Sequence, residues 1–247
     1  MTVDPSLWVA GVDGCPAGWL VVLRNLNAGA APQKVIMSSF GDIPALPERP
    51  AVIAVDIPIG LPDRTGPGGR GCDVAARKVI GARQSSIFSV PARAAVMKTD
   101  YRDACRLAFA TSTPPRKVSK QCFNIFPKIR EVDAWIMAHG NNGIYECHPE
   151  VAFWALNGET PLTEPKKVKS RPFEPGLALR RSLLQDAGFA EEFLNGLPFR
   201  RKDAGPDDLL DACAAAWTAE RIHNGSAIQF PDEPLTDGHG IPMTIWA

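Results

Sequence analysis

The fold is decided by WVAGVDGCPAGWLVVL, residues 8–23, in which two apolar runs flank a short turn. The runs, residues 8–12 and 19–23, are typical of buried β-strands. The segment between them contains Gly and Pro, which favour a turn that reverses the chain. The stretch therefore predicts a hairpin-like pair of strands near the beginning of the domain.

Three more apolar runs extend this pair into a sheet. Residues 34–39 and 51–57 predict a third and a fourth strand, and residues 144–147 predict a short fifth strand. The fourth run is almost continuously apolar, as expected of a strand that is buried on both faces.

Helical patterns occupy much of the remaining chain. The clearest is residues 207–223, which Gly225 closes and whose alanines form a small face that lets a helix lie close to a sheet. The other predicted helices are residues 72–82, 100–111, 149–156 and 177–187. Residues 230–247 are rich in Pro and Gly, and we predict that they wrap around the domain as a tail.

The middle of the chain has a different composition. Residues 58–71 form a Pro- and Gly-rich loop, and the polar basic stretch 114–120 follows two of the predicted helices. We therefore predict one α/β domain over residues 1–247, with an inserted basic subdomain at about residues 61–142 after the fourth strand.

Charge is segregated along the chain although 27 basic residues balance 27 acidic ones. Residues 64–130 hold 14 Lys and Arg against three acidic residues, and residues 166–202 hold nine against four. An acid-rich framework with basic segments favours an acidic site beside a surface that binds a polyanion. The alternative is a solvated basic face without a partner.

Composition also limits the class of protein. With 45% hydrophobic residues the chain can bury a full core, and no apolar run is long enough to predict a membrane span. The six cysteines form no Cys-x-x-Cys pair, and the N-terminus has no export pattern. We expect a cytoplasmic protein with reduced thiols.

Acidic residues follow the apolar runs, and they are the best candidates for catalytic or metal-binding residues. Asp13, Asp56 and Glu146 each end a predicted strand, and Asp208 and Asp211 open the last helix on one face. A buried carboxylate usually has a partner or a metal, so the pattern favours a Mg²⁺ or Mn²⁺ site that hydrolyses phosphodiester bonds. Taken singly, Asp13 could stabilise a turn and Asp208 could cap a helix.

Four motifs occur in an order that resembles a known family: WVAGVDGC at residues 8–15, VDIPIGL at 55–61, YECHP at 145–149 and DDLLDA at 207–212. Together they resemble domain-of-unknown-function family 429, described as predicted nucleases of the ribonuclease H fold. The resemblance spans residues 9–225 and implies a ribonuclease H-like mixed five-stranded sheet flanked by helices. It also implies that Asp208 and Asp211 are similar to the closing Asp-x-x-Asp of Holliday-junction resolvases of the RuvC type.

The expected roles follow from both lines of reasoning. We expect the metal ligands to be Asp13, Asp56, Asp208 and Asp211. Glu146 has no clear equivalent in the resolvase pattern, and it is a further catalytic ligand, a proton acceptor or the partner of an arginine. We expect a phosphate to be bound by Arg77, Arg83 and Ser85, unless they form a solvated helix face. His148 is expected to be a hydrogen-bonded histidine at a strand end rather than a base.

The favoured function is a Mg²⁺- or Mn²⁺-dependent nuclease or related phosphoesterase that acts on nucleic acid or a small nucleotide phosphoester. Two alternatives remain at this stage. One is an ATP-dependent phosphotransferase of the actin and sugar-kinase type, which normally needs two such domains. The other is a non-catalytic binding module whose carboxylates pair with inserted arginines. The sequence leaves the oligomeric state open.

Overall fold

The computed structural model describes residues 7–27, 30–169 and 171–247. Within them, one mixed sheet of seven strands has the order β3-β2-β1-β4-β5-β9-β8. The strands are β1 (Trp8–Cys15), β2 (Gly18–Asn25), β3 (Gln33–Met37), β4 (Val52–Val55), β5 (Ile144–Cys147), β8 (Gln229–Phe230) and β9 (Ile245–Trp246).

The sheet combines an antiparallel half with a parallel half. β1, β2 and β3 run antiparallel in chain order, while β4 lies parallel to β1 and β5 lies parallel to β4. β9 continues the parallel half, and β8 closes it antiparallel to β9. The five predicted strands are present, so the α/β class is confirmed.

The predictions of a five-stranded sheet and of a wrapping tail were incomplete. The tail supplies β9, and β8 begins just before it, so both extend the sheet beyond β5. Each of these strands is only two residues long, which is too short to produce an alternating apolar pattern in the sequence.

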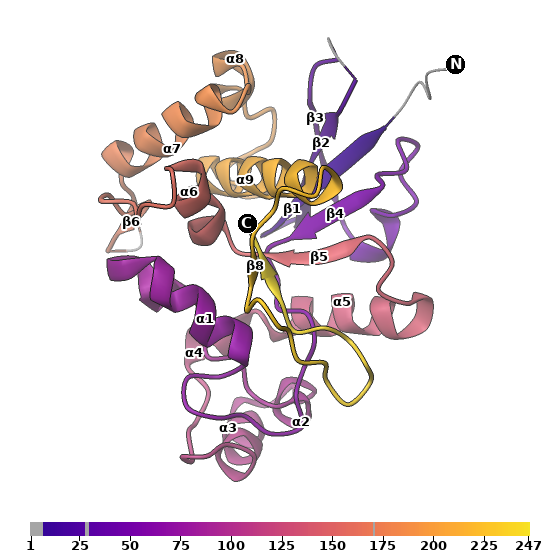
Figure 1. The fold of residues 1–247 in the computed structure, drawn as a ribbon, viewed down its shortest axis with the longest axis vertical. Coiled ribbons are helices and arrows are strands. Elements are labelled where there is room, and N and C mark those ends of the chain that lie inside the picture. The colour runs from indigo at the N-terminus through magenta and orange to yellow at the C-terminus, as the bar shows by residue number, and fades with distance from the viewer. Residues whose placement is uncertain (1–6, 28–29, 170) are drawn as a thin grey trace.

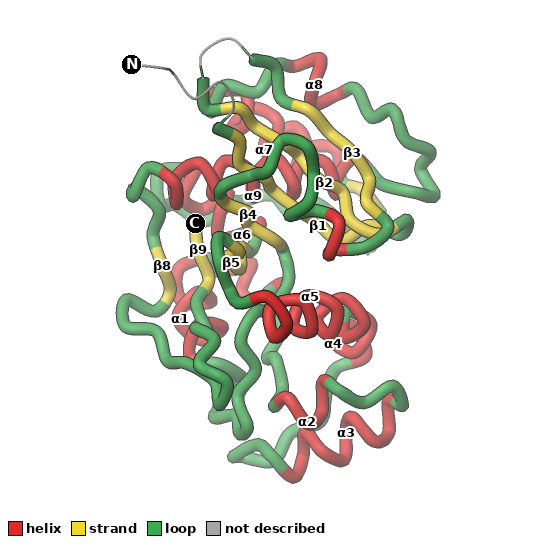
Figure 2. Tube along the Cα trace, turned by 90° about the vertical axis from the view of Figure 1, so that its right-hand side faces the viewer, coloured by secondary structure: helices red, strands yellow, loops and turns green. Residues whose placement is uncertain are grey.

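Helices cover both faces of the sheet (Figures 1 and 2). They are α1 (Gly71–Val79), α2 (Arg93–Val96), α3 (Tyr101–Ala110), α4 (Lys120–Asn124), α5 (Phe126–His139), α6 (Pro149–Leu156), α7 (Glu174–Asp186), α8 (Glu191–Asn195) and α9 (Pro206–His223). Two 3₁₀ turns, η1 (Phe40–Asp42) and η2 (Gly81–Ser86), and a small ribbon of β6 (Lys167–Val168) and β7 (Arg171–Pro172) complete the described elements. None of the described helices is long and apolar enough to cross a membrane.

One face of the sheet is covered by α9, which packs against β1, β2 and β4. The approach is so close that a Cβ added to Gly11 would lie 2.0 Å from the backbone nitrogen of Ala216 and 2.2 Å from the carbonyl oxygen of Ala212. The predicted small face of this helix is therefore confirmed. It fixes α9, and the acids at its beginning, against the centre of the sheet.

The opposite face is covered by α5. Its buried residues Phe126, Ile129, Val132 and Ile136 belong to the same apolar cluster as inward-facing residues of β1, β2 and β4. This helix lies within residues 61–142, so part of the segment predicted as an insertion contributes directly to the central core. α2, α3 and α4 gather at the end of the molecule away from α7 and α8 (Figure 1).

Candidate functional site

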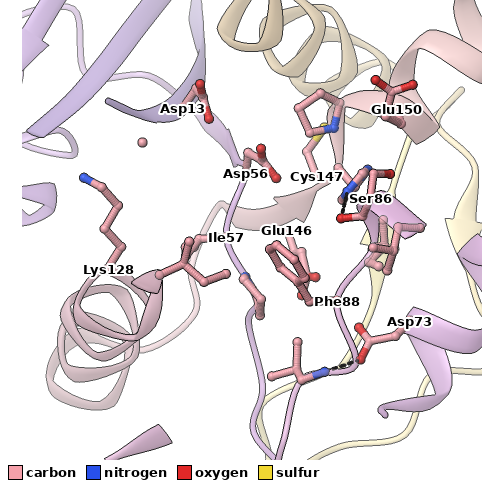
Figure 3. A pocket seen from close by; sticks show the side chains of 18 of the residues that line it. Asp13, Asp56, Ile57, Asp73, Ser86, Phe88, Lys128, Glu146, Cys147 and Glu150 are labelled. Atoms are coloured by element: carbon pink, nitrogen blue, oxygen red, sulfur yellow. Dashed lines mark hydrogen bonds between the residues drawn. The ribbon is translucent and has the colours of Figure 1, made fainter. Parts of the chain in front are cut away.

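The ends of β1 and β4 bring Asp13 and Asp56 together. The two strands are parallel and pair Val12 with Val55, so the acids that follow are neighbours in register. The Asp56 amide donates a hydrogen bond of 2.9 Å to the Val12 carbonyl. The two side chains line the same cavity, and Figure 3 shows them side by side at its edge.

The first turns of α9 add Asp208 and Asp211. Asp208 accepts a hydrogen bond of 2.8 Å from the Gly205 amide, so it does cap the helix. Asp211 is buried, and its Oδ1 atom has no hydrogen-bond partner among the described residues. The helix therefore directs one capping and one buried carboxylate toward the strand ends.

The electrostatics show that these four carboxylates interact. Burial raises the pKa of Asp13 well above its usual value, and the charges of Asp56, Asp211 and Asp208 raise it further. Burial and the charge of Asp211 raise the pKa of Asp56 from 3.8 to about 7. Three separate elements thus supply a cluster that accumulates negative charge.

Lys166 stabilises this cluster, although no pattern in the sequence indicated it. Its ammonium forms an ion pair with the Asp211 carboxylate. Burial alone would lower the pKa of Lys166, but the charges of Asp211 and Asp13 raise it above its usual value. In the described part of the chain, no three His, Cys, Asp or Glu side chains already stand close enough together to hold a metal ion.

Glu146 has a different environment from the other acids. Its two oxygens accept hydrogen bonds of 2.8 and 2.6 Å from the Arg70 guanidinium, and one of them also accepts 2.7 Å from the Ile59 amide. Arg70 bonds Asp73 as well, at 2.7 Å, and both side chains of this ion pair are about 1% exposed. Of the expected roles for Glu146, the structure shows the arginine partner.

Asp13, Asp56 and Glu146 line a cavity of about 340 Å³, whereas Asp208 and Asp211 are not among its described lining residues. Arg70 and two lysines, Lys128 and Lys166, line it as well. Lys128 lies over the Trp19 ring, 4.2 Å from the ring centre, and burial lowers its pKa. The only signal for these lysines in the sequence was their place in basic segments, which does not identify single residues.

His148 also lines the cavity, and its Nε2 atom lies 3.3 Å from the Ser86 carbonyl. Burial lowers its pKa to about 4, so the imidazole is neutral at pH 7. Its Nδ1 atom is buried and has no partner among the described residues. The expected strand-end histidine with a backbone hydrogen bond is therefore present.

The three residues expected to bind phosphate do not line this cavity. The Arg77 guanidinium bonds the Ile87 carbonyl, the Gly68 carbonyl and the Ser89 hydroxyl at 3.0, 2.6 and 3.1 Å, so it holds a loop together. Arg83 lies in η2, and Ser85 lines a second, neighbouring cavity.

Comparison with known proteins identifies the family. The model described as "Protein of unknown function (DUF429)" matches residues 11–236, so the chain belongs to this family. No curated protein and no solved structure matches the chain at a significant level. The predicted family is thus confirmed, while the nuclease activity that the resemblance implies stays a prediction.

Proposed function

We propose that this protein is a Mg²⁺- or Mn²⁺-dependent phosphodiester hydrolase, a nuclease with a ribonuclease H-like arrangement of its central strands. The observation that carries the proposal is the convergence of Asp13, Asp56 and Asp211 from β1, the end of β4 and α9. Burial raises the pKa of each of them, and the charge of Asp211 raises the pKa of both Asp13 and Asp56 further. Like charges that are buried or half-buried at adjacent strand ends destabilise a fold unless a cation compensates them, so a functional reason for keeping them is expected. The antiparallel order of β1, β2 and β3 before β4 and β5 supports the fold assignment.

The donor set fits a hard divalent cation. All the candidate ligands are carboxylate oxygens, which Mg²⁺ and Mn²⁺ prefer, and the Oδ1 atom of Asp211 is without a partner among the described residues. The proposal requires that binding draw the carboxylates closer together, with Lys166 leaving Asp211. A bound metal would supply an acidified water and stabilise the leaving oxygen of the phosphodiester.

The residues of the chain have separate roles in this proposal. Asp13 and Asp56 would hold the metal, and Asp211 would complete the set, while Asp208 keeps the beginning of α9 in place. Lys166, once released, pairs with a non-bridging phosphate oxygen of the substrate. Glu146 positions the loop after β4 through Arg70 and Ile59 rather than reacting itself.

A cleavage assay with and without Mg²⁺ or Mn²⁺ tests the proposal. Because residues that merely support metal ligands account for about 10–100-fold in activity, Asp56→Asn should lower the rate at least about 100-fold. Asp186→Asn is the matched control, since this exposed acid forms no ion pair with the described residues. If wild type cleaves neither single-stranded, duplex nor branched nucleic acid, nor a small diester, with either metal, the proposal is wrong.

One observation favours the second candidate, a non-catalytic module. Several acids near the cavity already form ion pairs with cations of the chain, such as Asp211 with Lys166 and Glu150 with Arg180. In that case Lys166→Met should destabilise the protein whether or not divalent metal is present. Under the hydrolase proposal, the same substitution frees Asp211, so added Mn²⁺ should restore the lost stability.

A further inference from the structure

A second cavity, of about 330 Å³, adjoins the one that contains the carboxylates. The two cavities share three lining residues, Ile87, Phe88 and Val90, so one segment of the chain separates them. The remaining walls come from residues 65–69, 85–91 and 108–121. These segments belong to the basic part of the chain, residues 64–130.

The lining of the second cavity suits an anion. Arg116 and Lys117 face it together with the hydroxyl-bearing residues Thr65, Ser85, Ser89, Ser112 and Ser119. None of its described lining residues carries a carboxylate, whereas Asp13, Asp56 and Glu146 all line the first cavity. Two adjoining cavities of opposite charge match a metal-binding site beside a site for the substrate phosphate.

The backbone around the two cations is held in place while their side chains stay available. The Ser112 hydroxyl accepts a hydrogen bond of 2.8 Å from the Arg116 amide, and the Tyr101 hydroxyl donates one of 2.9 Å to the Val118 carbonyl. Thr113 is bonded to Thr65 across the cavity wall at 3.0 Å. The side chains of Arg116 and Lys117 are exposed, and they form no hydrogen bond or ion pair with the described residues.

Phe88 stands where the cavities meet. Its ring is partly buried, and it makes no ring contact with another aromatic side chain of the described chain. Figure 3 shows it among the side chains that line the first cavity. An aromatic face between the acidic cavity and the basic one is suited to stack a nucleobase, and such stacking contributes about 1–3 kcal/mol per base.

We propose that the second cavity binds the phosphate of the nucleotide next to the cleaved bond, through Arg116 and Lys117, and that Phe88 stacks the base between the two phosphates. The inference rests on the proposed hydrolase function and makes it more specific. It identifies the substrate as a polynucleotide strand rather than a single nucleotide, because a nucleoside monophosphate has only one phosphate and the proposal needs two, one in each cavity.

The test compares a long and a minimal substrate in two double variants. Arg116→Ala with Lys117→Ala removes the cations of the second cavity. Lys98→Ala with Arg102→Ala removes the same charge from exposed residues that line neither cavity. With a single-stranded oligonucleotide, the first pair should raise KM about tenfold with little change in kcat, since it removes binding that is equal in ground state and transition state. With bis(p-nitrophenyl) phosphate, which reaches only the first cavity, KM should be unchanged.

Binding to a fluorescent oligonucleotide provides a readout without catalysis. In the Asp56→Asn background, the first pair should lessen the slope of log affinity against log salt by about 0.7 for each phosphate of a single strand that the protein no longer neutralises. The control pair, Lys98→Ala with Arg102→Ala, should change that slope less than the first pair does. Parallel measurements with DNA and RNA strands distinguish the two sources of the same phosphate chemistry.

Phe88→Leu examines the stacking step while keeping an apolar side chain in the wall. It should weaken oligonucleotide binding about fivefold or more. This factor corresponds to the lower end of the stacking energy, about 1 kcal/mol, at 1.4 kcal/mol per factor of ten. The KM for the small diester should not change. Equal effects of both double variants on the oligonucleotide, or an equal rise in KM for both substrates, would overturn the inference. Failure of wild type to hydrolyse either substrate would instead overturn the hydrolase function itself.

Discussion

Asp56 illustrates how a single side chain in this site links charge to stability. Its pKa is raised from 3.8 to about 7, first by burial and then by the charge of Asp211. Between these values the folded protein keeps a proton that the unfolded chain has already lost. The contribution of Asp56 to folding is therefore present below about pH 4 and is lost as the pH rises to about 7.

Asp56→Asn should abolish this loss. Without metal, in EDTA, the free energy of unfolding of the variant relative to wild type should increase from pH 4 to pH 7 and stay constant above it. We expect a gain of about 1–3 kcal/mol at pH 8, less than the full shift implies, because the side chain is partly exposed. Urea denaturation across this pH range measures the difference.

The stability of the variant must be compared with that of wild type at each pH, because His148 changes the stability of both proteins with pH in the opposite direction. Its pKa is lowered to about 4 by burial, so its contribution to stability is lost as the pH falls from 6.5 to about 4. The two effects oppose each other in the wild-type profile. A difference curve for Asp56→Asn that is flat from pH 4 to pH 8 would contradict the assigned environment of Asp56.

Arg70 carries a second prediction at the scale of single residues. It is 2% exposed, and its guanidinium bonds both Asp73 and Glu146. Arg70→Met would leave two buried carboxylates without their cation, so we expect a loss of about 3–5 kcal/mol in unfolding free energy. Equilibrium denaturation measures this loss. Arg181→Met should lower the unfolding free energy less, because the partner of Arg181, Glu174, is exposed.

At the scale of elements, the contact between β1 and α9 determines where the acids lie. A Cβ at Gly11 would meet helix backbone at 2.0 Å, and a backbone cannot move aside as a side chain can. Gly11→Ala should therefore cost about 3 kcal/mol or more, or prevent folding, as overpacking in a tight core does. Gly71→Ala at the beginning of α1 is the control, because its Cβ meets no atom within 4 Å, and it should be neutral or slightly stabilising.

The elements that the sequence predicted share one physical property: each has a pattern in its own residues that is typical of a strand or a helix. The apolar runs of β1 to β5 and the alanine face of α9 are local patterns, and the acids that follow them could be placed by strand pairing alone. β8 and β9 could not be predicted, because strands of two residues exist only through their neighbours. Lys166 lies in a loop that reaches Asp211 across 45 positions, and no local pattern indicates such a contact.

The phosphate-binding prediction shows the same limit. Arg77 and Arg83 lie in a basic segment of the sequence. The sequence does not show whether an arginine side chain bonds to its own loop or is available to a ligand. In the structure Arg77 uses its donors on Gly68, Ile87 and Ser89. The side chains of Arg116 and Lys117 are not used in this way, and only the fold places both of them at the second cavity.

At the scale of the whole molecule, the clustered acids predict that divalent metal stabilises the folded protein. Repulsion among Asp13, Asp56 and Asp211 is relieved when a cation binds, and a ligand that binds only the native state adds about 2.7 kcal/mol at 100 times its Kd. Thermal melting at pH 7.5 should therefore show a higher Tm with millimolar Mn²⁺ or Mg²⁺ than with EDTA. A protein of this length should gain about 2–4 °C for each kcal/mol.

The double variant Asp13→Asn with Asp56→Asn should melt higher than wild type in EDTA and should not respond to either metal. Asp186→Asn, which changes an exposed acid away from the cavity, should respond as wild type does. A metal response that persists in the double variant would show that the stabilising ion binds elsewhere. If instead wild type itself does not respond, the carboxylates are held by Lys166 and their neighbours alone, and the non-catalytic module becomes the better description of the fold.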